Sequence, residues 1–247
     1  MLNVLKNRFE QGCKTSNYPE EKVELLPRYR GRPEINPQAP MEIILACAKA
    51  CPQTAIDAED KTIDMGRCVF CGTCERVSKG AFVSFSGDFA VSVAEKAHLI
   101  TKGEIPDLTR HSRQHFKKLF GRSLQLRQVS AAGCNACEAD LNVLATPFFD
   151  LARFGINFVA SPRHADGIVV TGPVSRNMKT ALLQTYEATP EPRVVIAVGS
   201  CTLSGGPFRD SPEIAEGLDS LLPVDLFIPG CPPHPMTNLH ALLNFFK

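Results

Sequence analysis

The sequence predicts an α/β protein in which a doubly wound parallel sheet follows a small α+β domain. From about residue 122 onward, short apolar runs rich in β-branched residues alternate with helical stretches, which is typical of a parallel sheet covered on both faces. Before that point the chain has shorter runs bounded by Gly and Asp, as in small hairpins. Ten cysteines, several at two-residue spacing, fall in both parts. Two domains that each bind metal therefore account for the 247 residues.

The composition excludes several classes of protein. Hydrophobic residues make up 44% and charged residues 21%, which argues against long disorder. The net charge of +1 argues against a nucleic-acid-binding protein. No apolar run approaches the roughly 18–20 residues of a spanning helix, and we expect no secretory signal at the start. In such a chain, closely spaced cysteines favour metal over disulfides.

The first 35 residues predict an amphipathic segment followed by an extended arm. The apolar positions of this segment fall near helical spacing: Met1, Leu2, Leu5 and Phe9. Basic residues lie beside them, so the segment suits either a membrane surface or a partner subunit, and both interpretations stay open. Residues 15–40 contain five prolines and no sustained periodicity, which indicates the arm.

Residues 36–92 predict a small ferredoxin-like domain, and residues 93–121 a polar, basic linker that ends in a helix. Within the domain, KTIDMG and AFVSFSGDFAVSV have the β-prone character of small hairpins.

Residues 122–247 predict the α/β domain. Five runs favour strands: LQLRQVSAAG, INFVASP, DGIVVTGP, RVVIAVGS and VDLFIPG. Three stretches favour helices: EADLNVLATPFFDLARFG, SRNMKTALLQTYEATP and TNLHALLNFFK. Gly155 closes the first of these helices, and Ser175 is placed to cap the second.

The cysteines of the small domain predict one [4Fe-4S] cluster. Two-cluster ferredoxins carry the run C-x2-C-x2-C-x3-C-P twice, and the fourth Cys of each run binds the other cluster. Here the second run supplies three thiols and the first run supplies one that directly precedes a proline. The predicted ligands are Cys68, Cys71, Cys74 and Cys51. A zinc knuckle is the alternative, although zinc sites usually pair two C-x2-C arms.

The other ferredoxin site is degenerate. Its four positions hold Met41, Ile44, Cys47 and Ser78. One thiolate cannot hold a cubane, so we predict that Cys47 is a leftover core residue. Cys13, in the amphipathic segment, is expected to be an ordinary free thiol.

The remaining cysteines predict a second [4Fe-4S] cluster in the α/β domain. Each lies in a loop just after a predicted strand: Cys134, Cys137, Cys201 and Cys231. Ligand sites of open parallel sheets gather at the carboxyl ends of strands, so these thiols should converge. Nearby glycines would let the backbone approach the cluster and hydrogen-bond its sulfurs. They are Gly133, Gly205, Gly206 and Gly230. Buried structural cysteines are the alternative.

Glu138, next to Cys137, is the candidate for a proton-coupled carboxylate, since a nearby negative charge favours protonation when a cluster is reduced. The alternative is a structural role, in which Glu138 lies in the first turn of the following helix and is favoured there by the helix dipole. Arg163 and His164 are secondary candidates for tuning the cluster, or else solvated or partner-facing residues.

The motifs GCNACEADL, ASPRHADGIVVTGPVSR, VVIAVGSCTLSGGPF and IPGCPPHP occur in this order over about half of the chain. Together they resemble the small, cluster-bearing subunit shared by energy-converting [NiFe] hydrogenases and respiratory complex I (its 20 kDa subunit). The spacing Cys134-x2-Cys137 is similar to the formate hydrogenlyase-like branch. The segment from RGRPEINPQ to CVFCGTCE resembles the ferredoxin-like partner subunit, so the chain looks like a fusion of the two.

The resemblance implies a flavodoxin-like sheet and an electron-transfer subunit with two [4Fe-4S] clusters. It implies a large hydrogenase-like or quinone-site partner, membrane-arm subunits and an iron–sulfur electron donor, and no nucleic acid. It also implies a peripheral location on the cytoplasmic face of the inner membrane. Two alternatives stay open: the equivalent subunit of a complex I-like quinone oxidoreductase, and a zinc or assembly module without a redox role.

Overall fold

The centre of the molecule is a five-stranded parallel sheet. The structure, a computed structural model, describes residues 2–21, 23–105 and 123–246. The strands are β6 (Leu124–Ser130), β7 (Ile156–Phe158), β8 (Gly167–Thr171), β9 (Val194–Val198) and β10 (Leu226–Ile228). Their order is β10-β9-β8-β6-β7, with every pair parallel. Counted along the chain this is the order 2-1-3-4-5 of the flavodoxin-like fold, which confirms the predicted fold class.

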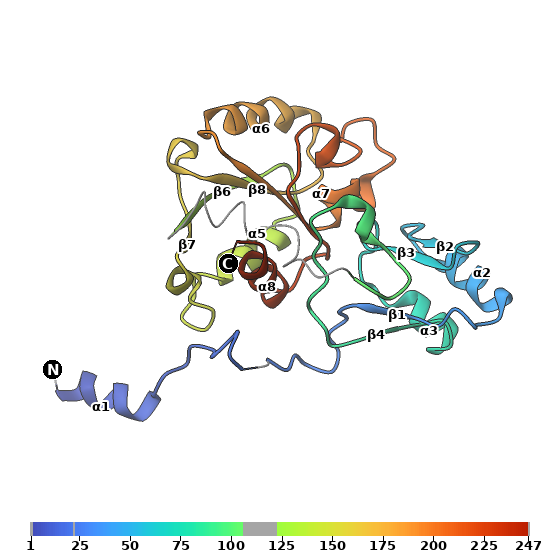
Figure 1. Ribbon diagram of the computed structural model, residues 1–247, viewed down its shortest axis with the longest axis horizontal. Coiled ribbons are helices and arrows are strands. Elements are labelled where there is room, and N and C mark those ends of the chain that lie inside the picture. Colours follow the sequence, from blue (N-terminus) through green and yellow to red (C-terminus); the bar gives the residue numbers. More distant parts are fainter. Residues whose placement is uncertain (1, 22, 106–122, 247) are drawn as a thin grey trace.

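Helices cover both faces of this sheet (Figure 1). On one face lie α5 (Ala136–Val143) and α8 (Pro235–Phe246), whose apolar side chains pack on β6, β9 and β10. On the other face lie α6 (Arg176–Ala188) and α7 (Ser200–Ser204). Strand β8 is buried at every residue, as a strand between two helical layers should be.

The helix predicted from residue 138 to Gly155 is too long. Helix α5 ends at Val143, and a short 3-10 helix (η2, Leu151–Phe154) follows. Pro147 explains the break, because a proline disfavours helical backbone at the residue before it. Thr146 then donates its hydroxyl to the carbonyl of Val143 at 2.7 Å. Ser175 occupies the N-cap position of α6, but its side chain makes no capping hydrogen bond within the described part of the chain.

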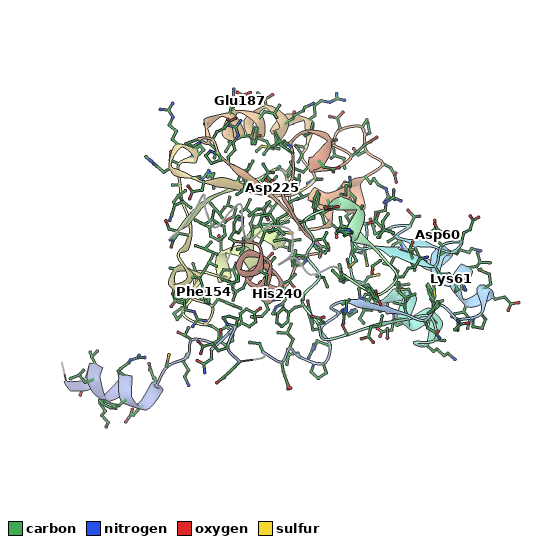
Figure 2. All side chains as sticks on the ribbon, in the orientation of Figure 1. Asp60, Lys61, Phe154, Glu187, Asp225 and His240 are labelled. Carbon is green, nitrogen blue, oxygen red and sulfur yellow. The ribbon has the colours of Figure 1, made fainter. Side chains whose placement is uncertain are left out.

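The cysteine-bearing block contains α2 (Met41–Ala50), α3 (Thr73–Ser78) and two small antiparallel sheets. One sheet pairs β2 (Ile56–Asp57), β3 (Thr62–Asp64) and β5 (Ile100–Thr101), and the β2–β3 turn carries Asp60 and Lys61 (Figure 2). The other pairs β4 (Val83–Phe85) with β1 (Pro33–Ile35). The hairpin around KTIDMG is confirmed. The one expected within AFVSFSGDFAVSV is wrong, because β4 takes its partner from the arm.

The block is packed against the sheet through apolar side chains. Met65, Val91, Val93 and Leu99 lie in the same core cluster as α6, α7 and one face of β8 and β9. Val93 also forms a backbone bridge with Phe227 of β10. The first residues of the predicted linker are therefore structured, with a 3-10 helix at Lys96–Leu99 (η1) leading into β5. The helix expected near residue 121 lies outside the described residues.

The amino-terminal segment is helical, as predicted. Helix α1 (Leu2–Gln11) extends away from the rest of the molecule (Figure 1), and Val4, Leu5 and Phe9 are exposed on it. Nowhere in the described ranges is a helix long and apolar enough to span a membrane.

The arm that follows α1 is held on the α5/α8 side of the molecule. Tyr18 is buried in that core, and its hydroxyl lies 2.6 Å from Nδ1 of His240 on α8 (Figure 2). Burial, reinforced by Asp88, raises the pKa of Tyr18 to about 12, so the phenol stays protonated. Arg153 donates to the carbonyls of Ser16 and Tyr18 at 2.6 and 2.9 Å. The arm is extended, as expected, but not free.

Replacing Tyr18 by phenylalanine should loosen the arm. The variant loses one hydrogen bond, worth about 1 kcal/mol, which raises the open population about fivefold. Limited proteolysis should therefore cleave the chain near residue 18 about fivefold faster, since cleavage follows the open population. Tyr29→Phe, which removes a hydroxyl further along the arm, should leave that rate unchanged. An unaltered rate in Tyr18→Phe would mean that the other contacts of the segment hold it, namely those of Arg153, the Ser16 N–H bond to the Phe148 carbonyl and the packing of the ring at position 18.

Candidate metal centres

The four cysteines predicted as the first ligand set line one cavity in the cysteine-bearing block. Cys51 is the C-cap residue of α2, and Cys74 lies in the first turn of α3. Cys68 and Cys71 lie in the loop that precedes α3. The structure thus brings a Cys-Pro from one helix end to a C-x2-C-x2-C loop, as the spacing predicts.

The backbone of this loop curls around its own sulfurs. Phe70 lies between Cys68 and Cys71, and Gly72 lies between Cys71 and Cys74. Both have left-handed φ values, 53° for Phe70 and 70° for Gly72. Within this loop the Phe70 N–H points at the Cys68 sulfur at 3.3 Å. In a separate turn after α2, the Ala55 N–H points at the Cys51 sulfur at 3.3 Å. Loops that alternate right- and left-handed residues form anion-binding concavities found at iron–sulfur sites. The donor set therefore fits a thiolate-bound cluster.

The protonation of these thiols also fits a metal-dependent site. Burial, opposed by the hydrogen bond from Phe70 and supported by the charges of the neighbouring thiols, raises the pKa of Cys68 to about 12. Burial likewise raises the pKa of Cys74 to about 11. Cys71 is the exception, because hydrogen bonds with Thr73 and the charge of Arg76 outweigh its burial and lower its pKa. Buried thiols of high pKa become thiolates when a metal binds and releases their protons.

The positions of the degenerate site are filled by packing. Ile44 and Cys47 are fully buried in the core of the block, and Ser78 is buried beside them. The Cys47 thiol donates to the Cys74 carbonyl at 3.4 Å. Met41 points outward and is 47% exposed. These contacts agree with Cys47 as a core residue, and its absence from the ligand set stays a prediction.

The second predicted set lies at the carboxyl edge of the parallel sheet. Cys134 and Cys137 follow β6, Cys201 lies in α7 after β9, and Cys231 follows β10. The sheet reverses its strand order between β6 and β8, and ligands of such sheets bind at this switch point. Thiols almost a hundred residues apart in sequence therefore share one edge.

The backbone closely approaches two of these thiols. A Cβ atom on Gly199 would lie 2.7 Å from the Cys137 sulfur, and one on Gly206 would lie 3.0 Å from the Cys201 sulfur. Of the four glycines predicted to let the backbone come close, only Gly206 has a cysteine sulfur among the nearest atoms of such a Cβ. A Cβ on any of the other three would meet different residues first. On Gly133 it would meet Glu138 and Gly172, on Gly205 it would meet Arg209, and on Gly230 it would meet Pro233. Gly199 was not predicted, because only the folded chain places it against α5.

The thiols of the second set interact electrostatically with one another, as neighbouring groups do. Burial raises the pKa of Cys137, and the charges of Glu138 and of the other three cysteines raise it further. Burial and the charges of Cys231, Cys134 and Glu138 raise the pKa of Cys201 to about 11. Cys134 and Cys231 are exposed, so one side of this site faces the molecular surface.

Glu138 lies in the first turn of α5, where the helix dipole favours it, and is buried. Its Oε1 accepts hydrogen bonds from the hydroxyls of Ser130 at 2.6 Å and Thr171 at 2.7 Å. Burial alone would raise its pKa, but these two donors outweigh it and lower the pKa. The carboxylate is thus held ionised beside Cys137. Its proton-coupled role stays a prediction.

Removing the Thr171 hydroxyl should destabilise the fold at this carboxylate. A hydrogen bond to a charged group contributes about 1.5–3 kcal/mol, so Thr171→Val should lower the free energy of unfolding by about 2 kcal/mol. Chemical denaturation followed by circular dichroism would measure it. Thr171→Ser keeps the donor and should remain close to wild type. Equal destabilisation by both variants would contradict the prediction, because Thr171→Ser keeps the donor to Glu138.

The other candidates lie apart from these sets. Arg163 and His164 are exposed in a short 3-10 helix (η3, Pro162–His164), and Cys13 is exposed after α1. In the described residues, no three His, Cys, Asp or Glu side chains are arranged to hold a single metal ion.

The fold and the order of the cysteine motifs together define an oxidoreductase subunit. Residues 134–245 match the family described as the NADH ubiquinone oxidoreductase 20 kDa subunit, and the chain belongs to this family. The predicted resemblance is confirmed. The match begins at Cys134, so it does not reach the cysteine-bearing block, whose origin as a fused ferredoxin-like subunit stays a prediction.

Individual relatives are named as subunits of larger complexes. The chain is 43% identical over 126 residues to a probable membrane-bound hydrogenase subunit mbhJ of Pyrococcus furiosus, covering 51% of this chain and 75% of the relative. It is 42% identical over 124 residues to formate hydrogenlyase subunit 7 of Escherichia coli, covering 50% of this chain and 49% of the relative. A solved chain of the membrane-bound sulfane sulfur reductase, an archaeal respiratory membrane complex, shares 33% identity at a TM-score of 0.47. That match covers 53% of this chain and 72% of the other.

Proposed function

We propose that this chain is the iron–sulfur electron-transfer subunit of a membrane-associated oxidoreductase of the formate hydrogenlyase type. It holds two [4Fe-4S] clusters and relays electrons to or from a large catalytic subunit. One observation carries the proposal: two separate four-cysteine sets are each gathered into one place, on two parts of the chain that share a core. The family match and the two hydrogenase-type relatives support it.

The residues of the chain have defined tasks in this function. Cys51, Cys68, Cys71 and Cys74 hold the first cluster, and Cys134, Cys137, Cys201 and Cys231 hold the second. When bound, each cluster supplies reversible one-electron transfer. The N–H groups aimed at Cys68 and Cys51 stabilise the charge of the thiolates.

The second site is placed to exchange electrons with a partner. Cys134 and Cys231 are exposed at the carboxyl edge of the sheet, so a redox group on a large hydrogenase-like or quinone-site subunit can dock against them. Helix α1 presents Val4, Leu5 and Phe9 away from the core, which suits attachment to membrane-arm subunits or to the membrane surface. An iron–sulfur protein would deliver electrons to the first site. Together these contacts make the chain a peripheral subunit on the cytoplasmic side of the membrane.

Metal analysis of the complex purified anaerobically through this chain tests the proposal. Iron together with nickel is the expected result, because a hydrogenase-type large subunit carries a nickel–iron centre. Zinc in place of iron would refute the electron-transfer function and favour the zinc or assembly module.

A complex I-like quinone oxidoreductase subunit is the second candidate. The description of the matching family, NADH ubiquinone oxidoreductase, favours it. In this case the purified complex would contain iron without nickel, and the large partner would bind a quinone. The two cysteine sets would have the same task in both candidates.

A further inference from the structure

A serine on α7 joins the two cysteine sets. Ser200, the first residue of α7, is 1% exposed, and its hydroxyl lies 2.7 Å from the carbonyl oxygen of Cys68. The same hydroxyl lies 3.1 Å from the carbonyl of Gly230, which already accepts the Ser200 N–H at 2.8 Å. A serine hydroxyl has a single hydrogen to donate. Its shorter contact, to Cys68, therefore takes that hydrogen.

Ser200 lies next to residues of both predicted ligand sets. Ser200 directly precedes Cys201, and it hydrogen-bonds both to Cys68 and to Gly230, the residue before Cys231. Ser200 thus connects the backbone of Cys68, a predicted ligand of the first set, to the backbone next to Cys201 and Cys231, two predicted ligands of the second set.

Among the residues that the structure describes, the other side-chain hydrogen bonds between α7 or the loop after it and the cysteine-bearing block do not end on a cysteine. Ser204, one turn further along α7, donates its hydroxyl to the carbonyl of Gly66 at 2.9 Å. Arg209 donates to the Gln53 carbonyl at 3.1 Å and to the Thr54 hydroxyl at 2.9 Å. These bonds hold the block in place, but of these described contacts only that of Ser200 runs from one predicted ligand residue to the chain neighbour of another.

We propose that Ser200 is the positioning residue of the junction between the two redox sites. Its hydroxyl fixes the Cys68 backbone against α7 and completes a continuous route of covalent bonds and one hydrogen bond from Cys68 to Cys201. In the transfer that this route serves, the first cluster is oxidised by one electron and the second is reduced by one. No proton moves and no bond is broken. The inference rests on the proposed function, since it requires both clusters.

Ser204 supplies a matched control. Both serines lie in α7, both are buried, and each donates one hydrogen bond to the loop that contains Gly66 and Cys68. Ser200→Ala and Ser204→Ala each leave one carbonyl without its donor, so similar losses of stability are expected. Only Ser200→Ala interrupts the route between ligands.

The experiment compares the intact complexes purified through wild-type, Ser200→Ala and Ser204→Ala chains. A photoexcited one-electron donor reduces the first site, and rapid-freeze electron paramagnetic resonance follows the reduction of each cluster with time. Iron content and the midpoint potential of each cluster are measured on the same samples. We expect Ser200→Ala to slow equilibration between the clusters several-fold, with iron content and potentials unchanged. Ser204→Ala should equilibrate at the wild-type rate.

Each other outcome contradicts the inference in a recognisable way. Equal rates of equilibration between the clusters in the two variants would show that the Ser200 hydrogen bond contributes no more to electron transfer than the Ser204 hydrogen bond. A loss of iron in Ser200→Ala alone would make the hydroxyl part of one site rather than the junction between two. A wild-type complex that lacks either cluster would refute the proposed function itself, and with it the inference.

Discussion

Replacing Cys51 by alanine is expected to remove the first cluster and with it about half of the iron bound to this chain. Cys51 stands at the end of α2, directly before Pro52, and faces the C-x2-C-x2-C loop across one cavity. Without its thiolate only three ligands remain, whereas [4Fe-4S] clusters are held by four. Iron analysis of the anaerobically purified chain, together with its electron paramagnetic resonance spectrum, measures the loss.

Cys47→Ala is the matched control. Cys47 belongs to the same helix but is fully buried, and its thiol donates to the Cys74 carbonyl rather than facing the cavity. Its iron content should equal that of wild type. A loss of iron from Cys47→Ala, with Cys51→Ala retaining its cluster, would mean that the two cysteines of α2 have been assigned the wrong way round.

Gly199→Ala is expected to remove the second cluster and to leave the first. The added Cβ would lie 2.7 Å from the Cys137 sulfur, which is closer than real Cβ contacts allow, so this thiol would have to move. The backbone of Gly199 also has φ of 87°, in the region where a side chain is strained. The chain should keep about half of its iron, and the signal of the second cluster should be missing from the spectrum.

Gly80→Ala separates the two causes. Gly80 has a similar φ of 78°, but no atom of the described residues lies within 4 Å of its Cβ position. An alanine at position 80 would therefore also be strained by its positive φ, but without contact with a thiol. Full iron content in Gly80→Ala beside a loss in Gly199→Ala would assign the effect to Cys137. Equal losses would assign it to backbone strain.

Much of the α/β half could be predicted from sequence, because its strands are buried on both faces and are therefore apolar throughout. RVVIAVGS and DGIVVTGP become β9 and β8 for this reason. Convergence of the second cysteine set followed from the same pattern, since loops after parallel strands share an edge. Periodicity was misleading between residues 144 and 155, where Pro147 and local turns override the helical pattern of apolar residues.

What the sequence could not supply are contacts between segments distant along the chain. Nothing in PEI marks it as the partner of β4, and nothing around Ser200 points to Cys68. The donors to Glu138 come from two different strands, β6 and β8, so no local motif contains them. Small polar residues such as Ser and Thr carry little signal until tertiary structure decides what they face.

The apolar contact between the cysteine-bearing block and the sheet has a kinetic consequence. Met65, Val91, Val93 and Leu99 are part of the core that also contains Leu182 of α6 and Leu203 of α7. Many redox proteins swing a tethered carrier between donor and acceptor, and their turnover then slows as the solvent becomes more viscous. Here a comparable swing would expose this core to water. The rate of electron transfer between the two sites should therefore not change when glycerol is added. Viscosity should slow only the association of the external electron donor with the complex.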